Sequence, residues 1–388
     1  MKLASRMSRL GTETAFEALA RAKALEAEGR SIVFLGIGEP DFDTPEHISE
    51  AAKVALDNGF THYTPSPGLG EVRECIAADM SKRLGYEVPA RRVIITPGAK
   101  PVMFFTILAL CEGGDEVVYP NPGFPIYESM IRFSGATPVP MQLREELDYN
   151  PDPDQLRTLF SSKTKLVIVN SPNNPCGSVM PNSTLELIAE LAAEHGAVVL
   201  SDEIYKDFYY EGTHASITRY AGMPEQTVVL DGLSKSYAMT GWRVGYGVFP
   251  EPLVEPVTRL VTNSVSCTPA FSQMATVAAL SASQNSVTDM VAEFKERRDI
   301  LVNGLNALPG ISCPMPRGAF YAFPSIKGTG LSSEAFERRA LNEAGVSLLA
   351  GTSFGEYGQG YVRISFANSQ ENIREALRRL EKFLATVT

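Results

Sequence analysis

Short apolar runs alternate with helix-like segments through the middle of this chain of 388 residues. One such segment, residues 185–195, carries its apolar residues on a single helical face and is ended by Gly196. Alternation of this kind predicts an α/β fold with a largely parallel sheet that is covered by helices on both faces. The expected strands are residues 92–96, 116–119, 166–170, 197–201, 228–230 and 244–249.

The pattern changes after about residue 269, where helices become longer and strands fewer. Residues 287–308 predict a long charged helix, residues 318–323 a strand, and residues 373–384 a terminal amphipathic helix. We therefore expect a large domain over residues 45–270. A smaller α+β domain would combine residues 1–44 with residues 271–388.

Two helix signals are expected near the amino terminus. Residues 14–29 are rich in Ala, Leu and Glu and end in a glycine, which is typical of a helix with a glycine stop. Thr44, Pro45 and Glu46 then predict a helix start, with a capping hydroxyl, a proline in the first turn and an acid near the positive end of the helix dipole.

Composition excludes several classes of protein. The chain is 44% apolar and 21% charged, as in ordinary soluble enzymes, and it has no run near the ~20 apolar residues that span a bilayer. The first ten residues lack the apolar region of a secretory signal, so we expect a cytoplasmic protein. A net charge of −10 argues against a nucleic-acid partner.

Cysteine and histidine spacing predicts neither disulfides nor metal binding. The five cysteines are far apart and form no C-x-x-C pair, which favours reduced thiols. The four histidines also lack the spacing of metal ligands. We expect no metal site.

The stretch from Ser234 to Tyr246 carries the clearest chemical signal. It follows the expected strand 228–230, so Lys235 would lie on a loop at the carboxyl end of a strand, where open α/β sheets bind ligands. A lysine amine can form a Schiff base with an aldehyde, and Arg243 and Ser234 offer donors for a phosphate. Together they suggest an aldehyde that carries a phosphate, such as pyridoxal 5′-phosphate.

Four other segments follow expected strands and carry polar, aromatic or small residues. Residues 97–101, Pro-Gly-Ala-Lys-Pro, precede an apolar helix, and a helix start built from small residues can bind an anion. The others are Asn-Pro-Gly-Phe-Pro-Ile-Tyr at residues 121–127, Asn-Ser-Pro-Asn-Asn-Pro-Cys-Gly at residues 170–177 and Ser-Asp-Glu-Ile-Tyr at residues 201–205. Each of these segments would be a common turn or strand end if it occurred alone. In this chain all four occur, one after another, each behind an expected strand.

This set of segments resembles the class I and II aminotransferases, which are fold-type I pyridoxal-phosphate enzymes. The chain is similar to the bacterial aspartate, aromatic and alanine aminotransferases over residues 14–384, nearly its whole length. The resemblance implies pyridoxal 5′-phosphate as cofactor. It also implies transfer of an amino group from an L-amino acid to a 2-oxo acid by a ping-pong mechanism, in a homodimer with shared active sites.

The resemblance also implies roles for residues around the cofactor. Lys235 would be the catalytic residue and attachment point, Asp202 would face the pyridine nitrogen, and a buried acid there would keep that nitrogen protonated. Arg243 and Ser234 would bind the phosphate, together with Tyr63 from the other subunit. The remaining cofactor residues implied are Gly98, Ala99 and Lys100 at the phosphate, Phe124 stacked on the ring, and Asn174 and Tyr205 at the ring oxygen.

Three residues are implied at the substrate. Arg363 would bind the α-carboxylate of the amino acid in a bidentate fork. Gly38 would let the backbone approach the same carboxylate, and Asn174 would contribute as well.

Two positions depart from the family pattern. Gly232 stands where the family often has a phosphate-binding serine, and Cys176 stands where the Asn-Pro-Thr-Gly motif has threonine. A different pyridoxal-phosphate reaction on an amino acid, such as β-elimination, oxidative decarboxylation or deamination, therefore stays open as the alternative, because function belongs to sites and not to folds.

Other classes fit the sequence less well. Residues 351–355 match the G-x-S-x-G pattern of serine hydrolases, but no histidine follows the serine. Residues 36–41 lack the third glycine of a dinucleotide-binding motif. A regulator built on the aminotransferase scaffold would be expected to carry a DNA-binding domain, for which the chain has no spare length.

Overall fold

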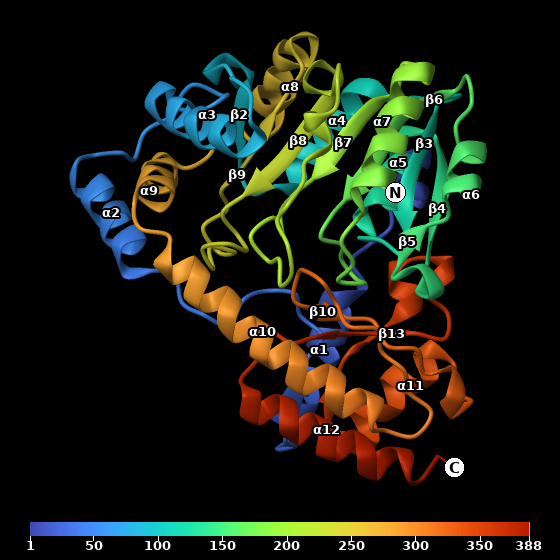
Figure 1. Ribbon diagram of the computed structural model, residues 1–388. Helices are drawn as coiled ribbons and strands as arrows, with labels where there is room; N and C mark the ends of the chain where they lie inside the picture. Colours follow the sequence, from blue (N-terminus) through green and yellow to red (C-terminus); the bar gives the residue numbers. More distant parts are fainter. Residues whose placement is uncertain (388) are drawn as a thin grey trace.

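The computed structural model describes residues 1–387 and is built around a twisted sheet of eight strands in the order β2-β9-β8-β7-β6-β3-β4-β5 (Figure 1). Neighbouring strands are parallel from β8 through β4, whereas β9 is antiparallel to both of its neighbours and β5 is antiparallel to β4. The mostly parallel central sheet that the sequence predicts is confirmed.

The strands of this sheet are β2 (Val93–Thr96), β3 (Glu116–Asn121), β4 (Thr137–Arg144), β5 (Asn150–Pro151), β6 (Thr164–Asn170), β7 (Val198–Asp202), β8 (Thr227–Gly232) and β9 (Gly245–Val248). The remaining strands are β1 (Val33–Phe34), β10 (Tyr321–Ala322), β11 (Val346–Ser347), β12 (Leu349–Ala350) and β13 (Val362–Ser365). The α-helices are α1 (Thr14–Ala27), α2 (Glu46–Asp57), α3 (Gly70–Leu84), α4 (Lys100–Leu110), α5 (Ile126–Ser134), α6 (Pro153–Leu159), α7 (Asn182–His195), α8 (Glu251–Ser264), α9 (Ala270–Ser281), α10 (Asn285–Asn306), α11 (Ser333–Arg339) and α12 (Gln370–Leu384).

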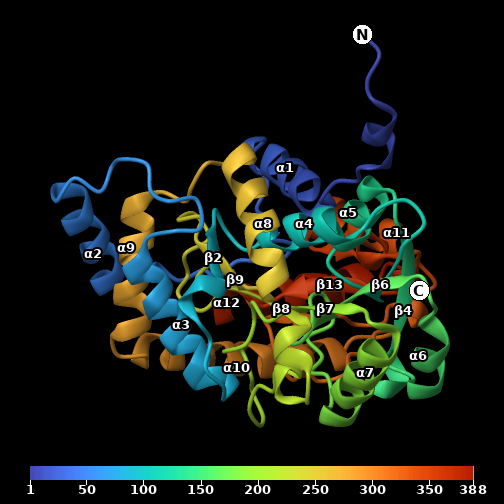
Figure 2. The same ribbon diagram turned by 90° about the horizontal axis from the view of Figure 1, so that it is seen from above.

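Helices cover both faces of the large sheet because successive strand residues point to opposite sides. On β3, for example, Val117 packs in one apolar cluster with residues of α4, α5 and α8, whereas Val118 packs in another with residues of α6 and α7. Figure 2, which looks along the layers, shows α4, α5 and α8 on one side of the sheet and α6 and α7 on the other. The middle of the sheet is therefore lined mainly by apolar side chains, and most of its polar residues lie near the strand ends.

Two smaller sheets lie beside the carboxyl ends of the parallel strands. β10, β13 and β12 form an antiparallel sheet, and β1 pairs in parallel with β11. The long helix α10 and the terminal helix α12 pack against this region, with Ile373, Ala376 and Leu380 of α12 buried (Figure 1). The boundaries expected for the two domains stay a prediction, and we note that α9 packs against α2 and α3 beside the large sheet.

The start of α2 differs from its expected form. Pro45 is the N-cap residue, and the cap has no side-chain hydrogen bond. The hydroxyl of Thr44 donates instead to the carbonyl of Ala238 at 2.7 Å and accepts from Trp242 Nε1 at 2.9 Å. The prediction that Thr44 caps the helix is wrong, because the loop after Lys235 folds back and takes up this hydroxyl.

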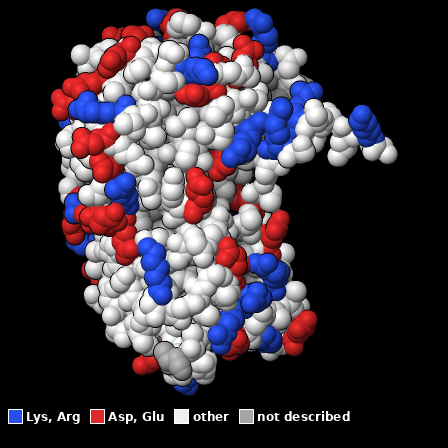
Figure 3. Space-filling view, turned by 90° about the vertical axis from the view of Figure 1, so that its right-hand side faces the viewer, with Lys and Arg blue, Asp and Glu red and all other residues white. Residues whose placement is uncertain are grey.

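The surface has no extended region of one charge sign on the face drawn in Figure 3, where acidic and basic side chains are interspersed. The first residues of the chain project from the body of the molecule (Figure 2) and are exposed. Within residues 1–387, no helix combines the length and apolar character that crossing a membrane requires.

We expect Phe294→Ala to destabilise the fold strongly. This α10 side chain is fully buried, with its ring centroid 5.6 Å from Phe208 and 5.3 Å from Phe320. Removal of a buried aromatic ring costs about 3–5 kcal/mol of unfolding free energy. Urea unfolding should show that loss, whereas Leu147→Ala at a 39% exposed side chain should stay within about 0.5 kcal/mol of the parent. Equal effects of the two substitutions would contradict this placement of Phe294.

Candidate active site

A cavity of about 600 Å³ lies where the carboxyl ends of the parallel strands meet the smaller sheets. Asp202 ends β7, Asn174 follows β6, Phe124 follows β3 and Lys235 follows β8. Because parallel strands all end at the same edge of the sheet, segments far apart in the sequence converge here. Every residue that the sequence predicts for the site lines this cavity, except Gly98 and Tyr63.

Lys235 presents its amine to the cavity. Its Nζ donates to the carbonyl oxygen of Gly38 at 2.5 Å and lies 5.8 Å from the ring centroid of Phe320. Desolvation lowers the pKa of Lys235 to about 8, with the positive charges of Arg363 and Lys100 adding to the effect and the carboxylates of Glu39 and Glu13 opposing it. A larger share of this amine is therefore neutral and nucleophilic near neutral pH than for an ordinary lysine.

Asp202 is buried and also lines the cavity. Its Oδ2 accepts from the hydroxyl of Tyr127 at 2.6 Å and its Oδ1 from the backbone N–H of Ile204 at 3.2 Å. Desolvation raises the pKa of Asp202 to about 6, although both hydrogen bonds favour the ionised form. A buried carboxylate of this kind is well suited to a cationic ligand, because an unpaired charge is costly to bury.

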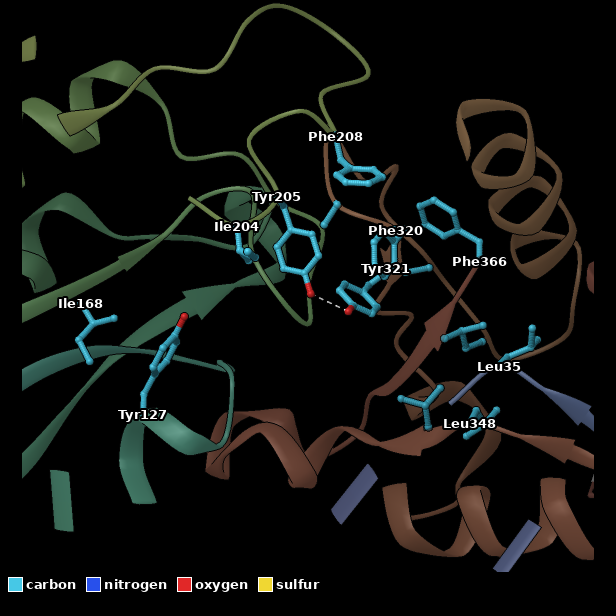
Figure 4. Packing of buried hydrophobic residues seen from close by; sticks show 14 of the residues in the cluster. Leu35, Tyr127, Ile168, Ile204, Tyr205, Phe208, Phe320, Tyr321, Leu348 and Phe366 are labelled. Carbon is cyan, nitrogen blue, oxygen red and sulfur yellow. Dashed lines mark hydrogen bonds between the residues drawn. The ribbon is translucent and has the colours of Figure 1, made fainter. Parts of the chain in front are cut away.

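Tyr205 and Tyr321 meet across the cavity at a hydroxyl separation of 2.7 Å (Figure 4). Tyr205 follows β7 of the large sheet, and Tyr321 lies on β10 of the smaller sheet. Both are buried, and desolvation raises the pKa of each phenol, so that both stay protonated as hydrogen-bond donors. The pair ties the two sheets together beside the ligand space.

Arg363 is buried on β13 and holds two segments of the cavity wall. Its Nη1 donates to Asn174 Oδ1 at 2.9 Å, and its Nη2 donates to the carbonyl of Gly36 at 2.5 Å. The guanidinium lies 4.5 Å from the ring centroid of Tyr321 and 4.7 Å from that of Phe354.

The charge of Arg363 is available to a ligand. Its Nε is buried without a hydrogen-bond partner, and among residues 1–387 no carboxylate forms an ion pair with it. The guanidinium that lines the cavity therefore carries an uncompensated positive charge, which suits a bound carboxylate.

The start of α4 forms the other end of the cavity, where its backbone lies against the backbone of β9. Gly98 has φ +85°, and a Cβ there would lie 2.1 Å from Nη2 of Arg243. A Cβ on Gly245 would lie 2.3 Å from the backbone nitrogen of Ala99. These glycines allow Arg243 and the first N–H groups of the helix to gather at one point, next to Ser234, where an anion would be favoured.

Arg243 reaches this point with a left-handed backbone, φ 56°. Its Nη1 donates to the carbonyl of Thr240 at 2.8 Å and its Nη2 to that of Pro97 at 3.3 Å. These neutral acceptors orient the guanidinium and leave its charge uncompensated. The residues present therefore fit pyridoxal phosphate, with an amine for its aldehyde, an acid for its ring nitrogen and a cationic pocket for its phosphate.

The two departures from the family pattern are accommodated locally. A Cβ on Gly232 would lie 3.0 Å from Cα of Gly245 and 3.1 Å from the carbonyl of Val244, so little room exists for a serine. Cys176 is buried, and its backbone N–H donates to Asn173 Oδ1 at 3.1 Å. The turn that carries Asn174 is thus stabilised by asparagine side chains.

Two expected residues lie differently from the rest. The side chain of Lys100 forms an ion pair with Glu13 and lies 5.3 Å from the ring centroid of Phe124. Tyr63 is 89% exposed, away from the cavity of its own chain. Their roles at the phosphate stay predictions.

Sequence reasoning missed several residues that shape the site. Tyr127 and Tyr321 hydrogen-bond to predicted residues, and the amide of Asn170 accepts from the N–H of Asn174 at 2.9 Å and donates to the carbonyl of Asp202. Asn170 could have been found from the sequence, because it ends the predicted strand whose following turn carries Asn174. Tyr321 could not have been found, because the small and aromatic residues around it in the sequence do not distinguish it from a core residue.

Metal binding finds no support in the described part of the chain, where no group of three or more His, Cys, Asp or Glu side chains could hold an ion.

Comparisons with known proteins agree with this geometry. A family model described as aminotransferase class I and II matches residues 30–380. An aspartate aminotransferase of Pyrococcus horikoshii is 42% identical over 95% of this chain and 93% of its own length. Aromatic-amino-acid aminotransferase 2 of Thermococcus litoralis is 41% identical over 91% of this chain and 92% of its own.

A solved structure shows the same fold. The aspartate aminotransferase of Thermus thermophilus with maleate superposes with a TM-score of 0.95 at 37% identity, covering 99% of this chain and 100% of the other. The likeness extends over both the large sheet and the smaller sheets.

We expect the stability of the ligand-free protein to report the raised pKa of Asp202. The folded-state pKa is about 6 against 3.8 for an ordinary aspartate, so the folded state binds this proton more tightly. This tighter proton binding stabilises the folded state fully below pH 3.8, and the effect is lost as the pH rises through about 6. The free energy of unfolding should fall by about 3 kcal/mol over this range. Asp202→Asn should remove this component. Unfolding free energies that run parallel for parent and variant between pH 4 and pH 7 would contradict it.

Proposed function

This chain belongs to the class I and II aminotransferases, and we propose that Lys235 is the residue to which its pyridoxal phosphate is attached. The protein is a pyridoxal phosphate-dependent transaminase that moves an amino group from an amino acid to a 2-oxo acid. The observation that carries the residue assignment is that Lys235 lines a cavity together with Asp202 and Arg363, where burial also lowers its pKa.

When bound, pyridoxal phosphate supplies an aldehyde and a ring that accepts electrons from the substrate's Cα. Lys235 would hold the cofactor covalently through Nζ, and its amine, once free, would serve as the general base at the substrate's Cα. Burial lowers the pKa of Lys235 to about 8, which leaves a share of this amine in the neutral, basic form near neutral pH.

The other residues orient the ring. Asp202 would pair with the protonated ring nitrogen, and Tyr127 would hold that carboxylate in place through its 2.6 Å hydrogen bond. Asn174 and Tyr205 would hydrogen-bond the ring oxygen, and Phe124 would stack on the ring. Together they would fix the orientation of the ring, which governs the bond at Cα that is broken.

Charged groups hold the two ends of the cofactor–substrate pair. Arg243, Ser234 and the backbone of Gly98, Ala99 and Lys100 would bind the phosphate. Arg363 would bind the α-carboxylate with its bidentate donors, and the backbone at Gly38 would approach the same carboxylate. The glycine is also needed for the packing of Tyr321, since a Cβ there would lie 2.2 Å from the Tyr321 hydroxyl.

The donors that we propose are those of the relatives, aspartate and aromatic amino acids. The cavity supports both, because it contains Lys100 with its counter-ion Glu13 as well as the apolar side chains of Phe16, Leu19 and Met103. A spectral screen of amino acids for conversion of the bound cofactor to its amine form would identify the donor. It would also separate transamination from β-elimination or oxidative decarboxylation, which do not leave that form.

We also propose a cytoplasmic homodimer in which each active site takes Tyr63 from the other subunit. The 89% exposure of Tyr63 supports this, as do the exposed apolar side chains of Val54, Leu56 and Val265. The division into a large domain of residues 45–270 and a small domain of residues 1–44 and 271–388 is proposed with it. Arg363 lies in the small domain, so an opening of the domains would withdraw it from the substrate and closure would return it to the position seen here, beside Asn174.

We expect Lys235→Ala to abolish covalent attachment of the cofactor. Borohydride reduction followed by peptide mapping should place the tag on Lys235 in the parent and nowhere in the variant. Transamination should fall by about 10²- to 10⁴-fold or more, because both the nucleophile and the base are lost. Lys53→Ala, at a surface lysine paired with Glu50, is the control and should keep full activity. A tag on another lysine would contradict the assignment.

Mixed dimers test whether the active sites are shared. We expect Tyr63→Ala and Lys235→Ala each to be impaired as homodimers, the former through weaker phosphate binding. After the two are mixed and refolded together, hybrid dimers contain one site with both Tyr63 and Lys235 intact. Activity above the sum of the two parents supports a shared site, and activity equal to that sum contradicts it.

A further inference from the structure

A buried network of charged side chains lies behind the cavity and does not line it. Glu203, Lys206 and Asp231 are each at most 8% exposed, and none of them belongs to the cavity wall. Arg83 of α3 reaches into the same place and completes the network. The mechanism outlined above uses none of these groups.

Asp231 is the centre of the network. Its carboxylate pairs with Lys206 Nζ at 3.1 Å and with Arg83 Nη2 at 3.0 Å. It also accepts from the N–H of Gly232 at 2.7 Å and from the hydroxyl of Tyr246 at 3.2 Å. These contacts bind the end of β8 to the neighbouring strand β9 and to helix α3.

The network reaches the two catalytic groups through their chain neighbours. Glu203, the residue after Asp202, pairs with Arg83 and accepts hydroxyl hydrogen bonds from Ser201 and Ser216. On the other side, Lys206 pairs with Asp207 at 3.2 Å, and Asp207 accepts from the hydroxyl of Ser236, the residue after Lys235.

Simple stabilisation does not account for this design. Apolar side chains of similar volume stabilise a core as well as buried ion pairs do, because charges are costly to desolvate. Hydrogen-bonded ion pairs, however, hold their two partners in a fixed relative orientation. Here they join the turn after Asp202 to the loop that carries Lys235, and the cofactor would have to fit between these two segments.

We propose that Lys206 is a positioning residue, which fixes the loop that carries Lys235 against the turn that carries Asp202 by bridging Asp231 and Asp207. The inference rests on the proposed attachment of the cofactor at Lys235. Without the bridge, the two carboxylates repel each other and Ser236 loses its oriented acceptor, so the Lys235 amine and the Asp202 carboxylate no longer keep their spacing.

The test compares Lys206→Met and Ser236→Ala with Arg92→Met. Arg92 is a matched control, because it is 4% exposed, donates to the carbonyl of Phe249 at 2.7 Å and pairs with Glu225, yet it does not touch the cavity. Three quantities are measured: the thermal midpoint of the apoprotein, its affinity for pyridoxal phosphate, and the pH midpoint of the bound cofactor's visible absorbance.

We expect Lys206→Met to weaken cofactor affinity by about 10- to 100-fold, because the apparent affinity falls by the fraction of molecules that still hold the two groups at the correct spacing. The pH midpoint of the absorbance should move as well. Ser236→Ala should change both in the same direction by less, and Lys206→Arg should restore them. Arg92→Met should lower the thermal midpoint and leave affinity and pH midpoint unchanged.

Unchanged affinity and pH midpoint in Lys206→Met overturn the proposal, as does an equal change in Arg92→Met. If Lys206→Met does not fold, Ser236→Ala decides, and parental behaviour of that variant overturns the proposal. A parent protein that fails to attach pyridoxal phosphate at Lys235 refutes the proposed function instead, so the two failures are distinct.

Discussion

The rest of the site depends on the hydrogen bond from Arg363 to Asn174, which joins the smaller sheet to the large sheet. Arg363 lies on β13 of the smaller sheet, and Asn174 lies in the turn after β6 of the large sheet. The same guanidinium holds Gly36 and is enclosed by the rings of Tyr321 and Phe354. A buried guanidinium that lacks a carboxylate partner is costly unless its N–H groups find other acceptors. The hydrogen bond to Asn174 therefore favours the position in which the smaller sheet lies over the ends of the parallel strands.

Burial has opposite consequences for Lys235 and Asp202, the two groups proposed to contact the aldehyde and the ring nitrogen of the cofactor. Desolvation lowers the pKa of Lys235 and raises that of Asp202, so each is shifted towards its neutral form before any ligand arrives. A neutral amine is the form that attacks an aldehyde. In the proposed mode of binding, a pyridinium ring would restore a charge partner to the acid, so that binding of the cofactor would relieve the cost of burying Asp202.

Sequence reasoning located the parts of the site that depend on where strands end. Asp202, Asn174, Phe124 and Lys235 each follow a predicted strand, and parallel strands bring such positions together without further information. The side chains of Tyr127, Lys100 and Thr44 could not be placed in this way. Each bonds to a residue more than 70 positions away, at Asp202, Glu13 and Ala238 respectively, and such pairings depend on how helices and loops pack.

The phosphate end shows why a missing hydroxyl at position 232 need not weaken the site. Gly232 pairs with Gly245 across β8 and β9, and Gly245 in turn crosses directly beneath Gly98 and Ala99. A Cβ on Gly245 would overlap the backbone at the start of α4, and a Cβ on Gly98 would overlap the guanidinium of Arg243. Either change would separate the backbone N–H groups of that helix from the point that Arg243 reaches. Close packing of these glycines therefore brings several backbone donors and a guanidinium to the point proposed for the phosphate, and such donors suit an anion better than one neutral hydroxyl does.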